Sequence, residues 1–379
     1  MRRADDAGDE ARDLRWLRRT LVLARRGAAT VAPNPRVGAV VVRDGAVLAE
    51  GWHRRVGEPH AEIEALSRLA DGAARDATLY VNLEPCSHQG RTPPCVPRVI
   101  GSGVRRVVCC HRDPDPRVAG SGLDQLRAAG ISVRSGLLVE ESVRENLPFL
   151  VPRLLGRPTV TLKWAASLDG KIATRTGASQ WISSPAGRRW ALGLREEHDA
   201  ILVGRGTVLA DDPRLDRRLG RAPGAIVRVV LDRSLRVPPG ARLFQVAGRV
   251  LLYTESRDEV ARAHLERAGA EIVWLESLDP AAVVADLGRR GLDSVLVEGG
   301  GEILGAFAAS GVFDRIAVCC APLLIGGEGA PGPLSGRGVA RLEEAARIEG
   351  LRTRRRGADL IIEGVRSGCS RDLSQRLAG

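Results

Sequence analysis

The sequence of 379 residues has no run of 18 uncharged apolar residues, and its start, MRRADDAGDEARDLRW, carries charges without an apolar stretch. These absences predict neither a signal peptide nor a membrane-spanning helix, so we expect a cytoplasmic protein. Long low-complexity runs are also lacking, whereas 44% of the residues are hydrophobic. This composition is typical of a globular α/β protein, and the length suits two domains of about 150 to 200 residues each.

Lysine is nearly absent, since Lys163 and Lys171 are the only two and arginine supplies the other cations. The formal net charge of +11 would favour nucleic-acid phosphates if the charge were gathered in one patch. Basic residues are instead spread over both halves without a polybasic block, so we expect no nucleic-acid partner. A lysine kept at 163 suggests a compact ammonium group in a pocket, whereas Lys171 is as readily a surface residue.

The seven cysteines are an odd number and do not suggest a disulfide framework in a reducing cytosol. Cys369 lies in a polar tail and is given no role. Four others end the apolar runs VVCC and IAVCC and are expected to be buried core thiols, namely Cys109, Cys110, Cys319 and Cys320. Cys86 and Cys95 remain, nine positions apart in EPCSHQGRTPPC.

The segment EPHAEIEAL precedes this cysteine pair and supplies His60 and Glu62. A zinc ion that activates water needs three protein ligands and one open position, which His60, Cys86 and Cys95 would provide. Glu62 follows the histidine at the spacing of the general acid/base in zinc nucleobase deaminases, and we predict that catalytic role for it. Taken singly, each residue also has an ordinary structural explanation, such as a first-turn acid or a buried thiol. The ordered combination favours zinc.

The pattern of elements predicts an α/β fold with helices packed around sheets. A helix is expected over 13–24, then a hairpin over 37–51 that turns at Asp44-Gly45. Prolines interrupt the chain before 158, where a new strand pattern opens. We predict one domain over 11–155, a second over 158–365 and a disordered polar tail over 366–379. In the second domain, Ser184 and Pro185 suit the N-cap and first position of a helix.

The segments APNPRVGAVVV, GEPHAE and EPCSHQGRTPPC together resemble the deaminase half of the bifunctional riboflavin-biosynthesis deaminase/reductase family. Most cytidine and tRNA-adenosine deaminases have two residues between the cysteines, whereas this sequence has eight. The resemblance implies a cytidine-deaminase-like domain whose long loop shapes a pocket for a phosphoribosylated pyrimidine. It makes Asn34 a candidate contact to the base, with a turn residue between two prolines as the alternative. His53 and His88 flank the site, and each is expected to line the pocket or to contact the substrate directly.

The resemblance continues past Pro158 in LKWAASLDGKIATRTGASQWISSP, GTVLADDPRL and VLVEGGGEI, which are similar to the reductase half of the same family. That half implies a fold similar to dihydrofolate reductase. VLVEGGGEIL predicts a strand, three glycines and a helix, a turn whose backbone N–H groups can approach a pyrophosphate. A tight turn without a ligand is the alternative, and the glycine spacing is not that of a Rossmann domain.

The resemblance also implies two sets of binding residues in the second half. Those expected along NADPH are Ala165, Trp181, Thr207, Asp211, Ser234, Gly300, Gly301, Glu302, Ile303 and Leu304. Those expected to face the substrate are Ser179, Arg195, Leu215, Arg218 and Glu298. Lys163 is expected there too, because a lysine is rare in this chain and suggests a compact ammonium group in a pocket. The two arginines suit a ribose 5-phosphate, although in so arginine-rich a chain either could be a solvated surface residue.

The resemblance therefore predicts two consecutive reactions with zinc and NADPH as cofactors. The first is the hydrolytic deamination of 2,5-diamino-6-ribosylamino-4(3H)-pyrimidinone 5′-phosphate, and the second is the reduction of the ribosyl group to ribityl. One alternative is a nucleobase or RNA deaminase with a non-catalytic C-terminal binding domain. Another is a zinc-stabilised nucleic-acid-binding protein without activity, which would need a fourth protein ligand. The oligomeric state is left open.

Overall fold

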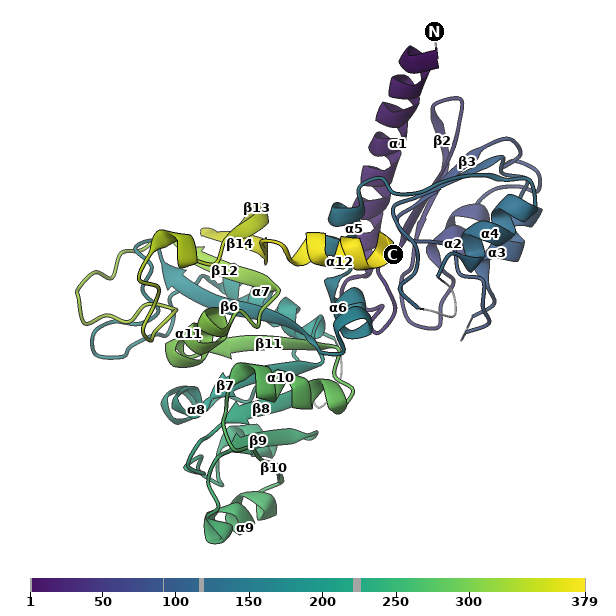
Figure 1. The fold of residues 1–379 in the computed structure, drawn as a ribbon. Helices are drawn as coiled ribbons and strands as arrows, with labels where there is room; N and C mark the ends of the chain where they lie inside the picture. Colours follow the sequence, from purple (N-terminus) through teal and green to yellow (C-terminus); the bar gives the residue numbers. More distant parts are fainter. Residues whose placement is uncertain (1, 91, 116–118, 221–225, 379) are drawn as a thin grey trace. The chain divides into compact units, whose positions relative to one another are not determined.

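The structure is a computed structural model that describes residues 2–90, 92–115, 119–220 and 226–378. The chain forms two compact units that divide between Leu155 and Gly156, and residues from Ser370 onward belong to the first unit (Figure 1). Among the described residues, none of the helices combines the length and the apolar character needed to cross a bilayer. Short 3₁₀ helices lie at Arg25–Gly27, Arg242–Gln245 and Leu342–Glu344.

The first unit contains a five-stranded sheet in the order β2-β1-β3-β4-β5. Its strands are β1 (Gly38–Arg43), β2 (Ala46–Trp52), β3 (Thr78–Val81), β4 (Arg106–Cys109) and β5 (Ser132–Arg134). Strand β1 pairs antiparallel with β2 and β3, whereas β3, β4 and β5 run parallel. The carboxyl ends of β3 and β4 therefore lie at one edge of the sheet. Asp44 and Gly45 both have positive φ, of 52° and 77°, as the predicted hairpin turn requires.

Helices pack against this sheet, with α1 and α2 directly on its strands. The described α-helices that lie wholly or mainly in this unit are α1 (Arg2–Ala24), α2 (Ala61–Leu66), α3 (Cys95–Gly101), α4 (Ser121–Ala128), α5 (Val139–Glu145), α6 (Leu147–Leu155) and α12 (Cys369–Ala378). Glycines let two of them sit directly on the strands. A Cβ at Gly38 would lie 2.2 Å from the carbonyl oxygen of Thr20 in α1, and one at Gly51 would lie 2.4 Å from that of Ala61 in α2. Gly38 thus sets the distance of α1 from the sheet, and Gly51 that of α2.

The C-terminal tail is a helix, and the prediction of disorder over 366–379 is wrong for the described residues. Cys369, Leu373 and Leu377 recur every four residues and form one apolar face of α12. Cys369 is 3% exposed and Leu373 is 1% exposed. Sγ of Cys369 lies 3.6 Å from Oδ1 of the buried Asp314, so this cysteine is part of the core. The polar composition of the tail suggested disorder, but a few apolar residues at helical spacing stabilise a helix.

The second unit contains a nine-stranded sheet in the order β10-β9-β8-β7-β11-β6-β12-β14-β13. Seven strands from β10 to β12 in this order are parallel, and β14 and β13 are antiparallel. The strands are β6 (Thr159–Ser167), β7 (Ala200–Gly204), β8 (Val227–Leu231), β9 (Val250–Thr254), β10 (Ala270–Trp274), β11 (Ser294–Gly299), β12 (Arg315–Ala321), β13 (Ile348–Arg356) and β14 (Asp359–Arg366).

Five α-helices complete the second unit, namely α7 (Pro185–Glu196), α8 (Arg205–Asp211), α9 (Glu259–Arg267), α10 (Pro280–Arg289) and α11 (Gly301–Ser310). Ser184 is the N-cap of α7, where its side chain accepts from the backbone N–H of Gly187, and Pro185 opens the helix as predicted. The predicted core thiols are confirmed at Cys109, Cys110 and Cys319, whereas Cys320 is only partly buried. Because the central strands are parallel, the segments after β6, β7, β8 and β11 gather at one edge, where α/β proteins bind ligands.

Candidate functional sites

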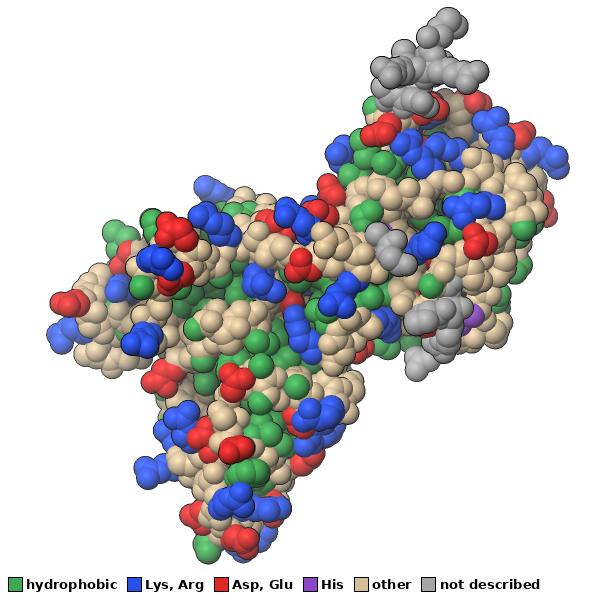
Figure 2. Space-filling model, in the orientation of Figure 1, with side chains coloured by type: hydrophobic (Ala, Val, Ile, Leu, Met, Phe, Trp, Pro, Cys, Tyr) green, Lys and Arg blue, Asp and Glu red, His purple; other side chains and the backbone are tan. Residues whose placement is uncertain are grey.

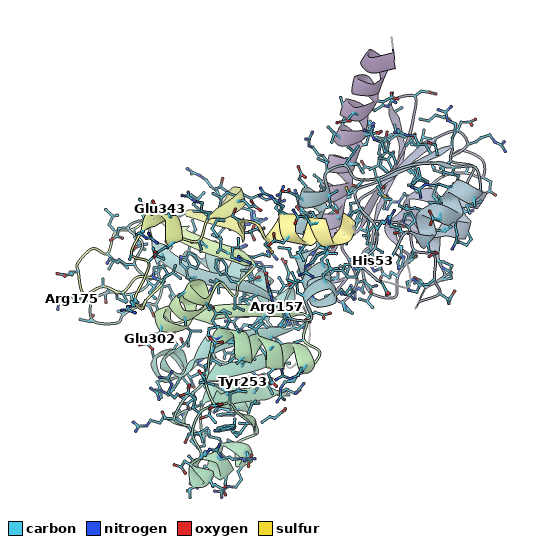
Figure 3. The ribbon with its side chains drawn as sticks, viewed as in Figure 1. His53, Arg157, Arg175, Tyr253, Glu302 and Glu343 are labelled. Atoms are coloured by element: carbon cyan, nitrogen blue, oxygen red, sulfur yellow. The ribbon has the colours of Figure 1, made fainter. Side chains whose placement is uncertain are left out.

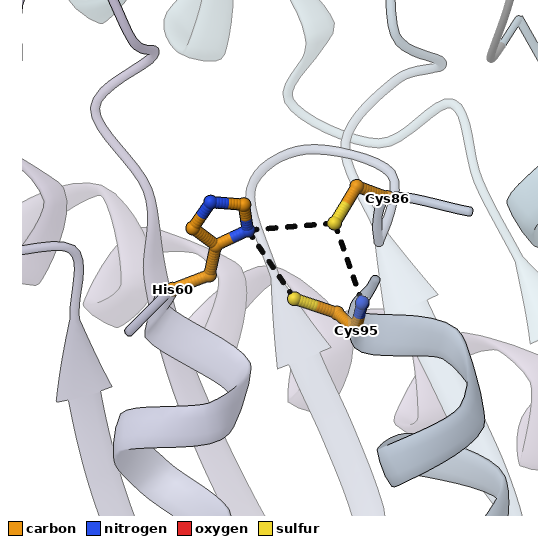
Figure 4. Close-up of side chains that lie close together, drawn as sticks. All are labelled: His60, Cys86 and Cys95. Carbon is orange, nitrogen blue, oxygen red and sulfur yellow. Dashed lines mark hydrogen bonds between the residues drawn. The ribbon is translucent and has the colours of Figure 1, made fainter. Parts of the chain in front are cut away.

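Three metal-binding side chains meet in the first unit. His60 is the N-cap of α2, Cys86 follows the carboxyl end of β3, and Cys95 begins α3. Nδ1 of His60 lies 3.4 Å from Sγ of Cys86 and 3.3 Å from Sγ of Cys95 (Figure 4). Within the described part of the chain, these residues form the one cluster of His, Cys, Asp and Glu that could hold a metal ion. The fold therefore brings together the zinc ligands that the sequence predicts.

The spacing of the donor atoms fits a tetrahedral zinc ion. Usual Zn–N and Zn–S bond lengths place nitrogen and sulfur about 3.6 Å apart in a tetrahedral site. The observed separations of 3.3 and 3.4 Å are close to that value. Nε2 of His60 lies 3.1 Å from Oγ1 of Thr92, a contact that orients the ring with Nδ1 toward the sulfurs. Three protein ligands leave the fourth position to water, as in catalytic zinc sites.

Without a metal ion, the surroundings favour a thiolate at Cys86 and a neutral thiol at Cys95. Contacts with Cys95 and His60 lower the pKa of the Cys86 thiol to about 4, and the backbone N–H of Cys95 donates to Sγ of Cys86 at 3.3 Å. The side-chain contact with Cys86, together with burial, raises the pKa of the Cys95 thiol. The contact with Cys86 also raises the pKa of His60. A divalent cation would deprotonate both thiols and complete the site.

Glu62 has a different environment from the other acid of the same helix. Its side chain is 3% exposed, and burial followed by the negative charge of Cys86 raises the pKa of its carboxyl to about 7. Glu64 instead lies 3.3 Å from Nε of Arg54 and 3.5 Å from Nη2 of Arg68. A carboxyl that titrates near neutral pH can both accept and release a proton. Glu62 is therefore the acid of α2 that suits proton transfer.

His53 holds Asn34 in place. Nε2 of His53 lies 3.1 Å from Nδ2 of Asn34, and its Nδ1 lies 3.1 Å from the carbonyl oxygen of Pro59. These contacts fit a tautomer in which Nδ1 donates to Pro59 and Nε2 accepts from the Asn34 amide. His53 is 2% exposed and is labelled in Figure 3. The structure thus favours a positioning role for His53 over direct contact with a substrate.

His88 lies in the loop between the two cysteines. The ring is partly buried, and Nδ1 is a buried atom without a hydrogen-bond partner among the described residues. Most buried polar atoms in proteins have a partner. An unsatisfied ring nitrogen on the loop that joins two metal-binding residues suits a contact to a bound ligand.

Two buried asparagines hold the segment that follows Asn34, and the sequence analysis missed both. Asn82 accepts from the backbone N–H of Gly38 at 2.8 Å and donates to the carbonyl oxygen of Arg36 at 3.0 Å. Asn146 accepts from the backbone N–H of Arg36 at 2.7 Å and donates to the same carbonyl oxygen at 3.0 Å. A polar residue within the apolar strand end LYVNL is the signal that could have revealed Asn82.

Glu84 holds the loop on the other side of Cys86 and was also missed. Its carboxylate is 3% exposed and accepts from four backbone N–H groups, those of Asp113, Gly120, Gly122 and Leu123. The donors lie in the segment after β4 and in the first turn of α4. An acid between an apolar strand and a proline was the available signal. Glu84 fixes the neighbourhood of Cys86 without being a ligand in the cluster.

In the second unit, β11 runs into α11 through Gly300, which is the N-cap of the helix. The predicted strand, glycine turn and helix are therefore present. A Cβ at Gly301 would lie 2.6 Å from Oγ of Ser335, whereas one at Gly300 would meet its nearest atom, Oγ1 of Thr207, only at 3.6 Å. Glycine at 301 is thus required by the close approach of the segment around Ser335, a reason that the sequence analysis did not foresee.

Lys163, Arg195 and Glu298 form a buried ionic cluster. Arg195 makes two bonds to the carboxylate of Glu298, at 3.0 and 2.9 Å, and a third to the carbonyl oxygen of Asp216 at 3.1 Å. Nζ of Lys163 lies 3.8 Å from Oε2 of Glu298. Burial alone would raise the pKa of Glu298, but the charges of Arg195 and Lys163 outweigh it and hold the pKa at about 2. Arg195 thus uses two of its five N–H donors on Glu298 and one on Asp216, and its contact with a phosphate stays a prediction.

The remaining predicted residues of the second unit differ in exposure. Leu215 and Leu304 are each 1% exposed and belong to the core. Arg218 is half exposed and bonds Asp216 through Nε at 2.7 Å. Trp181 is 67% exposed beneath the guanidinium of Arg188. The other predicted residues of this unit are partly or fully exposed. They are Ala165 on β6, Ser179 before α7, Thr207 and Asp211 on α8, Ser234 after β8, and Gly300, Gly301, Glu302 and Ile303 at the start of α11. Glu302 is labelled in Figure 3.

Comparison with known proteins shows close relatives over nearly the whole chain. The riboflavin biosynthesis protein RibD of Bacillus amyloliquefaciens is 41% identical over 354 residues, which cover 92% of this chain and 95% of that protein. RibD of Escherichia coli K12 is 40% identical over 362 residues, with 92% and 98% covered. The solved structure of Acinetobacter baumannii RibD, form 1, has a TM-score of 0.77 and 32% identity, and covers 94% of this chain and 99% of that one. The deaminase/reductase of Thermotoga maritima has a TM-score of 0.75 and 34% identity, with 94% and 99% covered.

Two family models match the halves of the chain. The cytidine and deoxycytidylate deaminase zinc-binding region matches residues 11–111, and the RibD C-terminal domain matches residues 158–362. Fold and sites therefore define a bifunctional enzyme in which a zinc-type deaminase domain precedes an NADPH-dependent reductase domain. The chain belongs to the RibD family, whose members carry out a deaminase and a reductase step of riboflavin biosynthesis. The match over the second half argues against the alternative of a non-catalytic binding domain.

Proposed function

We propose that this chain deaminates the 2,5-diaminopyrimidine ribosylamine phosphate and then reduces the ribosyl group of the resulting aminouracil phosphate with NADPH. The observation that carries the first step is the convergence of His60, Cys86 and Cys95 beside a buried Glu62. The Thermotoga maritima relative is named for these two activities, and it resembles this chain over 94% of its length. A location in the cytoplasm stays a prediction, as does the absence of a nucleic-acid partner. On the face drawn in Figure 2, Lys and Arg are interspersed with Asp and Glu.

In the deaminase site, His60 and the thiolates of Cys86 and Cys95 would hold zinc. When bound, the ion makes a water molecule acidic enough to lose a proton near neutral pH. Glu62 accepts that proton and returns it to the departing amino group, a role that its raised pKa suits. Asn34, oriented by His53, hydrogen-bonds the pyrimidine, and the unpartnered Nδ1 of His88 supplies a further polar contact.

In the reductase site, NADPH supplies the hydride, and the protein aligns the donor with the sugar and excludes water. We assign the start of α11, from Gly300 to Leu304, to the cofactor, and the exposed indole of Trp181 to stacking against it. Glu298, which Arg195 holds through two bonds, lies 3.8 Å from the ammonium group of Lys163, and that group has donors left for the sugar. Arg218 is the better candidate for the substrate phosphate, since its side chain is half exposed whereas Arg195 is engaged.

Paired assays on the full-length protein test this assignment. Glu62→Gln keeps the shape of the side chain but removes the proton shuttle, so ammonia release should fall by at least about a hundredfold. Reduction of the deaminated phosphate should persist. Glu64→Gln is the matched control, because that carboxylate pairs with arginines near the surface. Ammonia release that survives in Glu62→Gln would show that the residue is not the general acid/base.

The second assay uses Lys163→Met, which keeps most of the length of the side chain and removes its charge. NADPH oxidation should fall by about tenfold or more, as expected for the loss of a charged contact, while ammonia release continues. Arg189→Ala, at an exposed position of α7, is the control. If a folded, zinc-loaded variant at either site loses both activities, the picture of two independent sites on one chain is wrong.

A further inference from the structure

Three arginines that are far apart in the sequence line one hollow of the first unit. Arg43 is the last residue of β1, Arg75 lies in the turn before β3, and Arg105 directly precedes β4. The hollow has a volume of about 400 Å³ and is lined by Arg43, Asp44, Gly72, Arg75, Asp76 and Arg105. This volume is within the range of small-molecule sites. The fold thus gathers cations that the sequence disperses.

The hollow lies at the end of the sheet opposite the zinc cluster. Thr78, the first residue of β3, pairs with Val42 of β1, the residue before Arg43. Thr78 also pairs with Arg106, the first residue of β4. The hollow is therefore at the amino ends of β3 and β4, whereas Cys86 follows the carboxyl end of β3. The four residues of β3 span about 13 Å, so the hollow is separate from the deaminase site.

Hydrogen bonds hold the loops that form the hollow. The backbone N–H of Arg105 donates to the carbonyl oxygen of Ala77 at 2.9 Å, which ties the segment before β4 to the segment before β3. Nη1 of Arg43 donates to the carbonyl oxygens of Ala73 at 3.2 Å and Arg75 at 3.4 Å. The end of β1 is thus tied to the same loop. The arginines of the hollow therefore extend from fixed backbone positions.

The charges of the hollow are available to a ligand. Within the described residues, Arg43, Arg75 and Arg105 form no ion pair, and all three side chains are exposed. Cations that line one concave surface concentrate the positive potential there and attract an anion. A guanidinium group presents a planar fork of N–H donors that matches the oxygens of a phosphate. The arginines therefore favour a phosphate group over other small anions.

Two aspartates of the hollow provide acceptors beside these donors. Within the described part of the chain, the carboxylates of Asp44 and Asp76 have no hydrogen-bond partner. Acidic side chains recognise ribose hydroxyl groups in nucleotide sites. A ligand that combines a phosphate with hydroxyl groups uses both kinds of side chain. We propose that this hollow binds a ribose-phosphate group, free or as part of a nucleotide, at a site separate from both active sites.

Local hydrogen exchange on the full-length, zinc-loaded protein tests the proposal. The substrates of both active sites carry a ribose phosphate, so the dissociation constant of ribose 5-phosphate is read from protection of the backbone amides of 72–77, measured by mass spectrometry. Arg75→Ala and Arg105→Ala should each weaken this binding by about tenfold, because a charge-assisted contact is lost. Arg18→Ala, at an exposed position of α1, is the matched control and should bind like the wild type. Ammonia release and NADPH oxidation without the probe should be unchanged in all three variants.

Aspartate variants separate a sugar phosphate from phosphate alone. Asp44 and Asp76 have positive φ, of 52° and 61°, a conformation that asparagine also accepts. Asp44→Asn and Asp76→Asn therefore keep the turns and remove the charges. Each should weaken ribose 5-phosphate by about fivefold, whereas inorganic phosphate should bind at least as tightly as before. Adenosine 5′-monophosphate is the nucleotide probe. Tighter binding of this nucleotide than of ribose 5-phosphate supports a nucleotide site, and the reverse order supports a site for a free sugar phosphate.

Three results would overturn the proposal. The first is wild-type protein in which ribose 5-phosphate gives no protection at 72–77. The second is an Arg75→Ala variant that binds ribose 5-phosphate like the wild type, or an Arg18→Ala control that loses as much affinity as Arg75→Ala. The third is equal binding of ribose 5-phosphate and inorganic phosphate with no effect of Asp44→Asn or Asp76→Asn, because the hollow would then attract phosphate by charge alone.

Discussion

Gly305→Ala in α11 should damage the reductase, although alanine is the better helix former. Within a helix, alanine is favoured over glycine by about 1 kcal/mol. A Cβ at Gly305, however, would lie 1.8 Å from the carbonyl oxygen and 2.8 Å from the carbonyl carbon of Ser335. These are backbone atoms, so no side-chain rotation relieves the contact. Ser335 has to retreat by about 1.6 Å to reach an ordinary contact distance of about 3.4 Å.

That retreat breaks existing contacts. The backbone N–H of Ser335 donates to the carbonyl oxygen of Gly301 at 3.0 Å, and a hydrogen bond lengthened by so much is lost. Upstream, the same loop is tied to Asp169, which accepts from the backbone N–H groups of Ile325 at 3.1 Å and Gly326 at 2.7 Å. Overpacking costs about 1 to 3 kcal/mol and the lost hydrogen bond about 1 kcal/mol, so the net destabilisation after the helix gain is about 1 to 3 kcal/mol.

Urea unfolding of the variant, followed together with NADPH titration and both activity assays, measures these effects. Gly193→Ala is the matched control, since Gly193 lies within α7 and a Cβ there meets nothing within 4 Å. The control should be neutral or more stable. We expect Gly305→Ala to weaken NADPH binding and to leave ammonia release unchanged. A variant as stable as Gly193→Ala with unaltered NADPH binding would refute the claim that Ser335 constrains the start of α11.

Three further outcomes follow from buried polar groups. Cys86→Ser should reduce bound zinc from about one equivalent to less than a tenth and abolish ammonia release, and elemental analysis checks it. Glu84→Gln should destabilise the first unit by about 2 to 3 kcal/mol in urea unfolding, because an amide N–H₂ would face backbone N–H donors. Burial lowers the pKa of His198 to about 4, so this ring stays neutral in the fold but takes up a proton on unfolding below about pH 6.5. Stability should therefore fall by about 2 kcal/mol between pH 7 and pH 5, and His198→Gln should remove that part of the loss in unfolding experiments at both pH values.

Local rules predicted the elements that short-range chemistry determines. Ser184 and Pro185 begin α7, and Asp44-Gly45 forms the hairpin turn, because caps and turns depend on adjacent residues. The zinc cluster was predictable because its residue types and order carry the chemistry. By contrast, β13 and β14 were not foreseen, since the arginines of LRTRRR gave no apolar alternation. Among the described strands, β13 pairs with β14 alone, and it is exposed along most of its length, so pairing defines it and burial does not.

Interactions between distant residues were the part of the sites that the sequence did not predict. Arg195 makes two bonds to Glu298, which lies 103 positions away in the sequence, and no local pattern indicated this pair. Leu215 and Leu304 matched a binding pattern, and their burial in the core was not foreseen, because it depends on the tertiary fold. Asn82 and Asn146 hold one backbone segment although they lie far apart in the sequence of the first unit. Such pairings depend on the tertiary fold, which a local pattern does not specify.

The two sites also treat buried charge in opposite ways. In the first unit, burial raises the pKa of Glu62 to about 7, and the contact with Cys86 together with burial raises the pKa of the Cys95 thiol. In the second unit, Glu298 already has Arg195 and Lys163 as partners, and its pKa falls to about 2. A buried charge without a partner is costly, whereas a compensated one persists without a ligand. A divalent cation would stabilise both thiolates of the deaminase cluster, whereas Glu298 in the second unit keeps its charge through Arg195 and Lys163.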